Sequence, residues 1–97
     1  MSVSVSIIVP CYNVAAYLDQ CMESLTGQSM KDIEIICVND GSSDRTAEIL
    51  REWRNRDRRV RIIDRKNSGV SAARNSGMAA AAGTYIGFVD PDDMVER

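Results

Sequence analysis

The chain has 97 residues, which is enough for one small domain but not for two. Hydrophobic residues make up 44% and charged residues 27% of the chain, a composition that excludes a disordered tail. The formal net charge of -2 excludes a general attraction to nucleic acid or to anionic membranes.

The cysteines and the N-terminal segment indicate the compartment. Cys11, Cys21 and Cys37 show no CxxC spacing and lie in apolar or helical patterns, so we interpret them as buried, reduced thiols. The apolar run near the N-terminus is shorter than the ~20 residues that span a bilayer, and no basic segment precedes it. We therefore expect a cytoplasmic protein.

The first half of the chain predicts a strand, a helix and a second strand. Residues 3–10 are β-branched and apolar and end at Pro10, where we expect the strand to run into a loop. Residues 14–25 place apolar side chains at steps of three and four, which predicts a helix closed by Gly27. Residues 33–39 are almost continuously apolar toward their end, as is typical of a central parallel strand.

The second half continues the alternation. A "DGSSD" turn, in which Asp44 is expected to cap the following helix, comes directly after the second strand. The remaining elements are a helix over 46–54, a strand over 60–64, an alanine-rich helix over 70–83 closed by Gly83, and a strand over 84–90.

Strands that alternate with helices predict an α/β fold, a Rossmann-like parallel sheet flanked by helices. We expect the strand order 3-2-1-4. All strands then end at the same edge, where ligands bind parallel sheets at the reversal of strand order. The polar residues that follow the first, second and fourth strands are Tyr12, Asn13, Asp40, Asp90 and Asp92.

The residue types at this edge point to a nucleotide. Asp90 and Asp92 are spaced to reach one hard divalent cation, which prefers oxygen ligands and shares them with phosphates. A zinc site is disfavoured because the chain has no histidine and no cysteine cluster. Tyr12 could stack on a planar base, and Asp40 could accept a hydrogen bond from an imide N–H such as that of uracil.

The segments "SIIVPCYN", "IEIICVNDGSSDRT" and "NSGVSAARNSGMAAAAGTYIGFVDPDD" occur in order through almost the whole chain and resemble the signatures of family 2 glycosyltransferases. That family is inverting and has the GT-A fold, and its members include bacterial enzymes of polysaccharide and cell-envelope biosynthesis. The resemblance implies a nucleotide-sugar donor, preferably UDP-linked, and Mn2+ or Mg2+ bound by the DxD pair Asp92 and Asp90. The nucleotide-sugar-binding residues that it implies are Pro10, Tyr12, Asp40, Arg74, Asp90 and Asp92.

The resemblance also implies a reaction that this chain does not complete alone. An acceptor hydroxyl, on a glycan or a lipid-linked sugar, would attack the anomeric carbon and invert it, activated by a carboxylate base expected downstream of Arg97. We therefore interpret residues 1–97 as the nucleotide-sugar-binding half of a GT-A domain, truncated just after DxD and inactive by itself. The full-length enzyme is expected in the cytoplasm, at the inner face of the membrane. The exposed edge of the fourth strand favours homo-oligomers.

Each candidate also has a structural interpretation. Asp90 and Asp92 could cap a helix, Asp93 is expected to be the N-cap of a helix that starts near Met94, and Asp40 could form a turn with Gly41. The other residues with a structural alternative are Tyr12, packed in its loop; Arg74, a charge on a helix surface; and Asn13, Ser68, Gly69 and Gly77, in loop geometry or close packing.

Two other functions compete with a glycosyltransferase. Eight of the twelve basic residues fall within 51–66 beside Trp53, a pattern that a non-catalytic nucleotide- or nucleic-acid-binding module would show. Acidic residues interrupt that segment and Trp53 falls on the apolar side of its helix, so we favour a solvated helix end and no nucleic-acid partner. A nucleotidyltransferase is disfavoured because "PCYNVAAYL" lacks a glycine-rich, basic phosphate loop.

Overall fold

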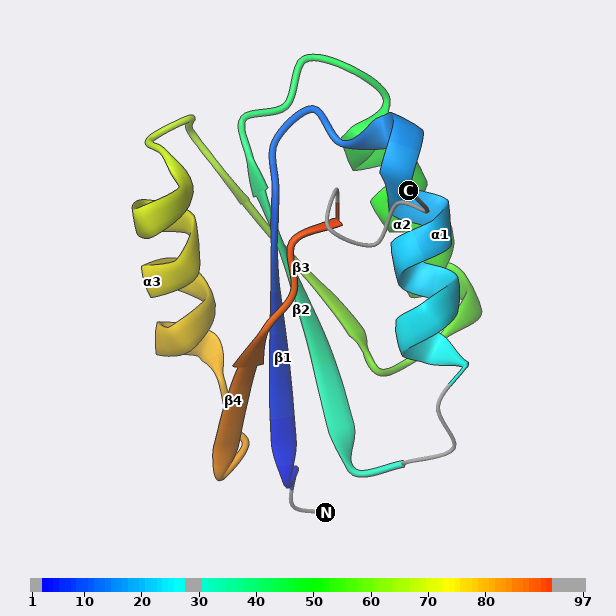
Figure 1. Cartoon of the computed structure of the whole chain (residues 1–97), viewed down its shortest axis with the longest axis vertical. Coiled ribbons are helices and arrows are strands. Elements are labelled where there is room, and N and C mark those ends of the chain that lie inside the picture. Colours follow the sequence, from blue (N-terminus) through cyan, green and yellow to red (C-terminus); the bar gives the residue numbers. More distant parts are fainter. Residues whose placement is uncertain (1–2, 28–30, 92–97) are drawn as a thin grey trace.

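The computed structural model describes residues 3–27 and 31–91, which form a parallel sheet between two layers of helices (Figure 1). The strand order is β3-β2-β1-β4, so the predicted α/β fold and the order 3-2-1-4 are confirmed. In chain order the elements are β1 (Val5–Cys11), α1 (Ala15–Thr26), β2 (Ile33–Asp40), α2 (Thr46–Arg56), β3 (Val60–Arg65), α3 (Val70–Ala80) and β4 (Tyr85–Phe88).

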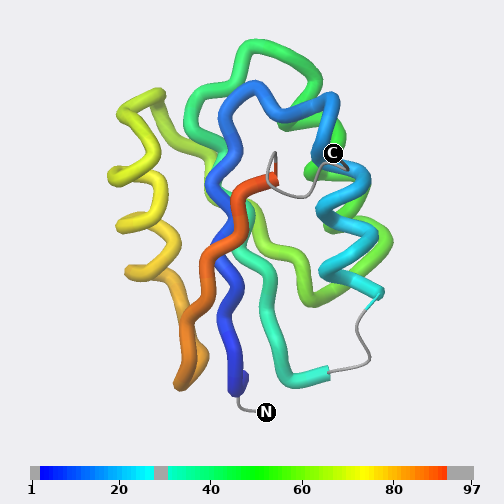
Figure 2. Tube along the Cα trace, viewed as in Figure 1, coloured from blue at the N-terminus to red at the C-terminus, as the bar shows by residue number. Residues whose placement is uncertain are grey.

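The helices cover the two faces of the sheet unequally. Helices α1 and α2 lie on one face and α3 lies on the other, as the ribbon and the Cα trace show (Figures 1 and 2). The larger core lies under α1 and α2 and includes Leu18, Met22 and Leu50. Strand β2 is buried along its whole length, which confirms its prediction as a central strand.

The smaller core lies under α3, which approaches the sheet closely. It consists of Ile8, Ile36, Val38 and Ala73. A Cβ atom added at Gly77 would lie only 2.4 Å from Cγ2 of Ile8, so glycine lets α3 pack against β1. This contact confirms the structural interpretation of Gly77.

Pro10 lies inside β1, because the strand continues to Cys11, one residue beyond the end that the sequence predicts. The Ile8 carbonyl accepts a hydrogen bond from Val89 N at 3.0 Å, which shows that Ile8 directs its backbone groups toward β4. Pro10 follows two residues later and directs its nitrogen to the same side, beyond Ile8–Phe88, the last β1–β4 pair. The missing N–H therefore costs no ladder bond, and β1 continues along β2 to Cys11.

The end of α3 also differs from the sequence prediction. The helix ends at Ala80, and Ala81 rather than Gly83 is the C-cap. A Cβ atom on Gly83 would lie 2.7 Å from the backbone nitrogen of Ser6, so this glycine is required by a close approach of two backbones and not by a helix end. The other predicted element ends agree with the structure within two residues, and Gly27 is the C-cap of α1 as predicted.

A buried polar network fixes the connection between α3 and β4. Glu34, on β2, accepts hydrogen bonds from Ser6 Oγ (2.6 Å), Arg61 Nη1 (2.7 Å) and the Ala82 amide (2.7 Å). Ser6 Oγ accepts a further bond from the Gly83 amide (2.8 Å). Strands β1, β2 and β3 each contribute one side chain to this network. The hydrogen bonds from the Ala82 and Gly83 amides hold the segment that leads into β4.

Three further features bear on the sequence predictions. All three cysteines are buried free thiols, as predicted. No helix within residues 3–27 and 31–91 is long and apolar enough to cross a membrane. Strand β4 pairs with β1 and exposes Tyr85, Ile86 and Phe88.

Candidate functional site

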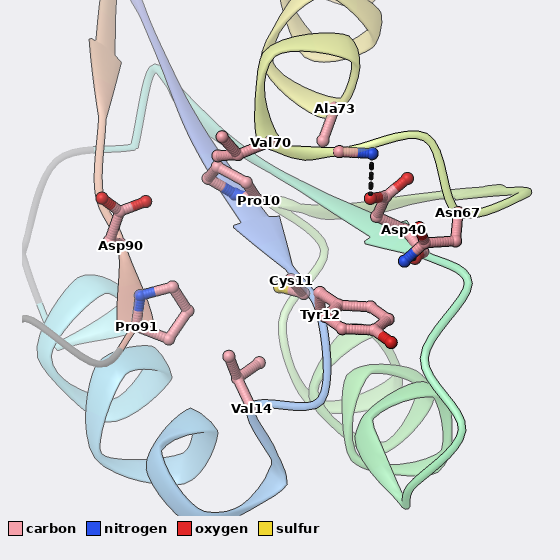
Figure 3. A pocket seen from close by; sticks show the side chains of 11 residues that line it. Pro10, Cys11, Tyr12, Val14, Asp40, Asn67, Val70, Ala73, Asp90 and Pro91 are labelled. Carbon is pink, nitrogen blue, oxygen red and sulfur yellow. Dashed lines mark hydrogen bonds between the residues drawn. The ribbon is translucent and has the colours of Figure 1, made fainter.

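A cleft of about 430 Å³ opens at the carboxyl ends of β1 and β2, beside the start of α3 (Figure 3). Four predicted site residues line it, namely Pro10, Tyr12, Asp40 and Asp90. The other lining residues are Cys11, Val14, Asn67, Gly69, Val70, Ala73 and Pro91. Asp92 and Asp93, together with the helix expected near Met94, lie outside the described residues.

Tyr12 presents its ring to the cleft. It follows β1 directly, the residue is 53% exposed, and the ring lies on the same side of the cleft opening as Asp40 and Asn67 in Figure 3. A ring exposed to this degree beside a cavity has a face available for a planar ligand. The alternative interpretation, a ring packed into its loop, fits this exposure poorly.

Asp40 ends β2 and is buried, with its carboxylate held by the loop before α3. Its two oxygens accept hydrogen bonds from the Ser68 amide (3.0 Å) and the Gly69 amide (2.9 Å), and Arg65 Nε lies 3.5 Å from Oδ1. An ionised carboxylate has about four acceptor positions, and Asp40 is one of the residues that line the cleft. These bonds also show that Ser68 and Gly69 have structural roles.

Arg74 lies near the predicted metal ligand rather than among the lining residues. Its Nη2 lies 3.4 Å from Oδ2 of Asp90, and its guanidinium carbon lies 5.7 Å from the centre of the Phe88 ring. Nε of Arg74 is buried and has no hydrogen-bond partner in the part of the chain that the structure describes. The structure thus joins two predicted site residues that are sixteen positions apart.

Asp44 links the starts of two helices. Its carboxylate accepts hydrogen bonds from the first residue of α2, Thr46 (2.9 Å), and from the first residue of α1, Ala15 (3.2 Å). Burial raises the pKa of the Asp44 carboxyl, but the hydrogen bonds from Thr46 and Ala15 outweigh this effect and lower the pKa below its ordinary value. The predicted capping role is confirmed, although Arg45 and not Asp44 is the residue directly before the helix.

The cleft wall formed by residues 67–73 was not predicted. Asn67 Nδ2 donates to the Asp40 carbonyl at 3.0 Å, and a Cβ atom on Gly41 would lie 2.6 Å from the Asn67 nitrogen. Gly41 has a φ of 71°, a backbone conformation that glycine adopts without strain. The signal in the sequence was "NSGV", a polar loop at the carboxyl end of the third strand and therefore at the same edge of the sheet.

Most basic side chains of the segment 51–66 are exposed, but its aromatic residue is buried. Trp53 is only 6% exposed, donates its indole N–H to Asp19 at 2.8 Å, and lies beneath Arg56 at 3.9 Å. Arg61 is paired with Glu34 and Arg65 with Asp40. Stacking on the bases of a nucleic acid needs an exposed aromatic ring, and Trp53 is buried, so the competing module is not favoured.

The described carboxylates do not form a complete metal cage. Within residues 3–27 and 31–91, no group of three or more His, Cys, Asp or Glu side chains could hold a metal ion. Asp90 contributes hard oxygen donors beside the cleft, which fit Mn2+ or Mg2+ when phosphate oxygens and water complete the coordination shell.

Comparison with known families identifies the chain. The model described as glycosyl transferase family 2 matches residues 6–97. The chain belongs to this family. The resemblance seen in the sequence is therefore confirmed over nearly the whole chain.

Members of the family align with the chain over only part of their length. The family 2 chain is 56% identical over 91 residues to the uncharacterized glycosyltransferase EpsJ of Bacillus subtilis (strain 168), covering 94% of this chain and 26% of EpsJ. It is 46% identical over 93 residues to the glycosyltransferase GlyA of Streptococcus pneumoniae serotype 4 (strain ATCC BAA-334 / TIGR4), covering 96% of this chain and 13% of GlyA. The chain thus spans about a quarter or less of these relatives.

A solved structure supports the fold. The crystal structure of S. aureus TarS 1-349 in complex with UDP-GlcNAc superimposes with a TM-score of 0.86 at 32% identity, covering 92% of this family 2 chain and 26% of the TarS chain.

Proposed function

We propose that this chain forms the donor-binding part of a glycosyltransferase that transfers a sugar from a nucleoside-diphosphate sugar, preferably UDP-linked, to an acceptor hydroxyl with inversion. The observation that carries the proposal is the convergence of Tyr12, Asp40 and Asp90 on one cleft. Family membership and the UDP-GlcNAc complex of a TarS structure support it.

Three residues would divide the recognition of the nucleotide. The exposed ring of Tyr12 stacks on the base, a contact worth roughly 1–3 kcal/mol per base in other proteins. The Asp40 carboxylate, held rigid by Ser68 and Gly69, accepts a hydrogen bond from the imide edge of uracil through an oxygen position that remains free. Pro10 continues the wall beside the base.

Arg74 and Asp90 would serve the diphosphate. The guanidinium of Arg74 has five N–H donors and the side chain is 40% exposed, so N–H groups remain for phosphate oxygens after Nη2 pairs with Asp90. Asp90 and Asp92 would hold Mn2+ or Mg2+, which when bound stabilises the negative charge of the departing nucleoside diphosphate. The chain's own part is to place these carboxylates beside the phosphates.

The acceptor and the catalytic base would come from sequence beyond this chain. Residues 1–97 correspond in this proposal to the N-terminal part of a GT-A domain, which the partial coverage of EpsJ and GlyA supports. The acceptor is proposed to be a glycan or a lipid-linked sugar, with the complete enzyme working at the cytoplasmic side of the membrane. In the isolated chain, the uncovered apolar strand β4 favours self-association.

Matched charge changes test the site. Asp90→Asn should weaken binding of UDP in the presence of Mn2+ by at least tenfold, because it removes an oxygen donor at the cleft. Glu52→Gln removes the same charge from an exposed position on α2 and should leave binding unchanged. Isothermal titration calorimetry on both variants checks this, and equal affinities for UDP would contradict the assignment of Asp90.

A further inference from the structure

The loop after β1 and the loop after β2 are joined by one side chain. Oδ1 of Asn13 accepts hydrogen bonds from the Ser43 amide (2.8 Å) and the Asp44 amide (3.3 Å), and Ser43 Oγ lies 3.4 Å from the same oxygen. The backbone N–H of Asn13 in turn donates to Ser42 Oγ at 3.0 Å. We call this set of bonds the Asn13 brace.

The backbone at Asn13 is held in an unusual conformation. Its φ of 51° is the only positive value at a non-glycine residue in the described part of the chain. Asparagine tolerates this left-handed region better than most residues, but it still costs free energy that the surrounding contacts must offset. Strained residues of this kind concentrate at ligand clamps, so the brace calls for a functional explanation.

The brace acts on Tyr12, the preceding residue. The Tyr12 hydroxyl has no hydrogen-bond partner within residues 3–27 and 31–91, and the residue is more than half exposed at 53%. Side-chain contacts therefore do little to fix the ring, and its direction depends on where the backbone places its Cα–Cβ bond. The left-handed turn at Asn13 and the anchored loop after β2 set that direction, with the ring beside the cleft as Figure 3 shows.

We infer that Asn13 is a positioning residue, whose side chain holds Tyr12 ready to stack on the base of the ligand. The inference rests on the proposed function for the ligand, but the brace and the free ring are features of the chain itself. Asn13, which the sequence predicts to be a structural loop residue, thereby affects binding through the residue before it.

Two substitutions separate the side chain from the backbone conformation. Asn13→Gly keeps the left-handed turn without strain but removes the acceptor of the brace. Asn13→Asp keeps an oxygen in the same position and also tolerates the turn. A third variant, Ser42→Ala, removes only the hydrogen bond from the backbone N–H of Asn13. It tests the brace if Asn13→Gly folds poorly.

The test compares UDP with inorganic pyrophosphate, both with Mn2+, by calorimetry. Asn13→Gly should weaken UDP about tenfold, as expected from losing part of a stacking contact, and change pyrophosphate less than about twofold because pyrophosphate has no base. Asn13→Asp should retain the affinity of the unsubstituted chain within about threefold, and Ser42→Ala should show a smaller loss for UDP only. Equal losses for both ligands, or no loss for UDP, would overturn the inference.

A measurement without ligand separates this inference from the proposed function. With ring-labelled tyrosine, NMR relaxation should show that the Tyr12 ring gains mobility in Asn13→Gly, whereas the ring of Tyr85 on β4 does not change. If the unsubstituted chain failed to bind UDP, the proposed function would be refuted while the ring measurement still decided on the positioning role. An unchanged Tyr12 ring would refute that role whatever the ligand.

Discussion

Gly83 and Gly87 lie on either side of the start of β4, yet alanine should affect them in opposite ways. At Gly83 a new Cβ atom would lie 2.7 Å from the Ser6 nitrogen, 2.8 Å from Ser6 Oγ and 2.9 Å from the Val5 carbonyl carbon. Two of these, the Ser6 nitrogen and the Val5 carbonyl carbon, are backbone atoms of β1, which cannot rotate away from the new Cβ atom. At Gly87 a Cβ atom would meet nothing within 4 Å.

The size of the effect follows from the contacts that would be lost. Forced packing costs about 1–3 kcal/mol, and loss of the Gly83 amide bond to Ser6 Oγ adds about 1 kcal/mol. Gly83→Ala should therefore reduce the free energy of unfolding by about 2–4 kcal/mol, which for a domain of this size lowers the melting temperature by about 10–25 °C. Gly87→Ala should raise the free energy of unfolding by about 0.5 kcal/mol, because alanine restricts the unfolded chain.

Thermal and urea unfolding, followed by circular dichroism, measure both variants under the same conditions. We expect a large difference in stability between these two glycine-to-alanine changes, which lie four residues apart. If the two variants melted together, or if Gly83→Ala matched the unsubstituted chain, Gly83 would not be a close approach and the path into β4 would be different.

Two further predictions concern titratable groups. Burial raises the pKa of Glu34, but hydrogen bonds from the Ala82 amide, Ser6 and Arg61 outweigh burial and lower the pKa below 4.5. The contribution of Glu34 to the free energy of unfolding is therefore complete above pH 4.5 and is lost as the pH falls through the folded-state pKa. Urea midpoints measured from neutral pH down to about pH 3 should fall less steeply in Glu34→Gln than in the unsubstituted chain, and parallel curves would contradict the network. Burial and the neighbouring Cys11 raise the pKa of Cys21 to about 12. A hydrogen bond with Cys37 and burial raise the pKa of Cys11. Both cysteines therefore form little thiolate at neutral pH. Thiol reagents should leave both cysteines unmodified in the native chain and modify them in urea; rapid native reaction would show that the core opens.

The sequence predicted the arrangement of the fold well because hydrophobic periodicity carries that information. A continuous apolar strand such as β2 and the spaced apolar face of α1 are local patterns, and they were found at the expected places. Alternation of strands and helices then restricted the sheet to parallel order. The topology placed five polar residues at the carboxyl ends of the strands, and three of them, Tyr12, Asp40 and Asp90, line the cleft.

The errors have a common physical cause, which is that they depend on contacts between distant segments. Pro10 is tolerated inside β1 only because β4 has already ended beside it, and Gly83 is needed only because Ser6 approaches it. The Asn13 brace likewise depends on the loop after β2. None of these contacts leaves a periodic signal in the sequence.

We propose above that this cleft binds a nucleoside diphosphate together with a divalent cation. Calorimetric titration of the folded chain with UDP, once in Mn2+ and once in EDTA, tests it most directly. We expect saturable binding in Mn2+ that EDTA abolishes or greatly weakens. Equal binding in both buffers would contradict the role of the carboxylates, and no binding in either would contradict the claim that this chain holds the donor site.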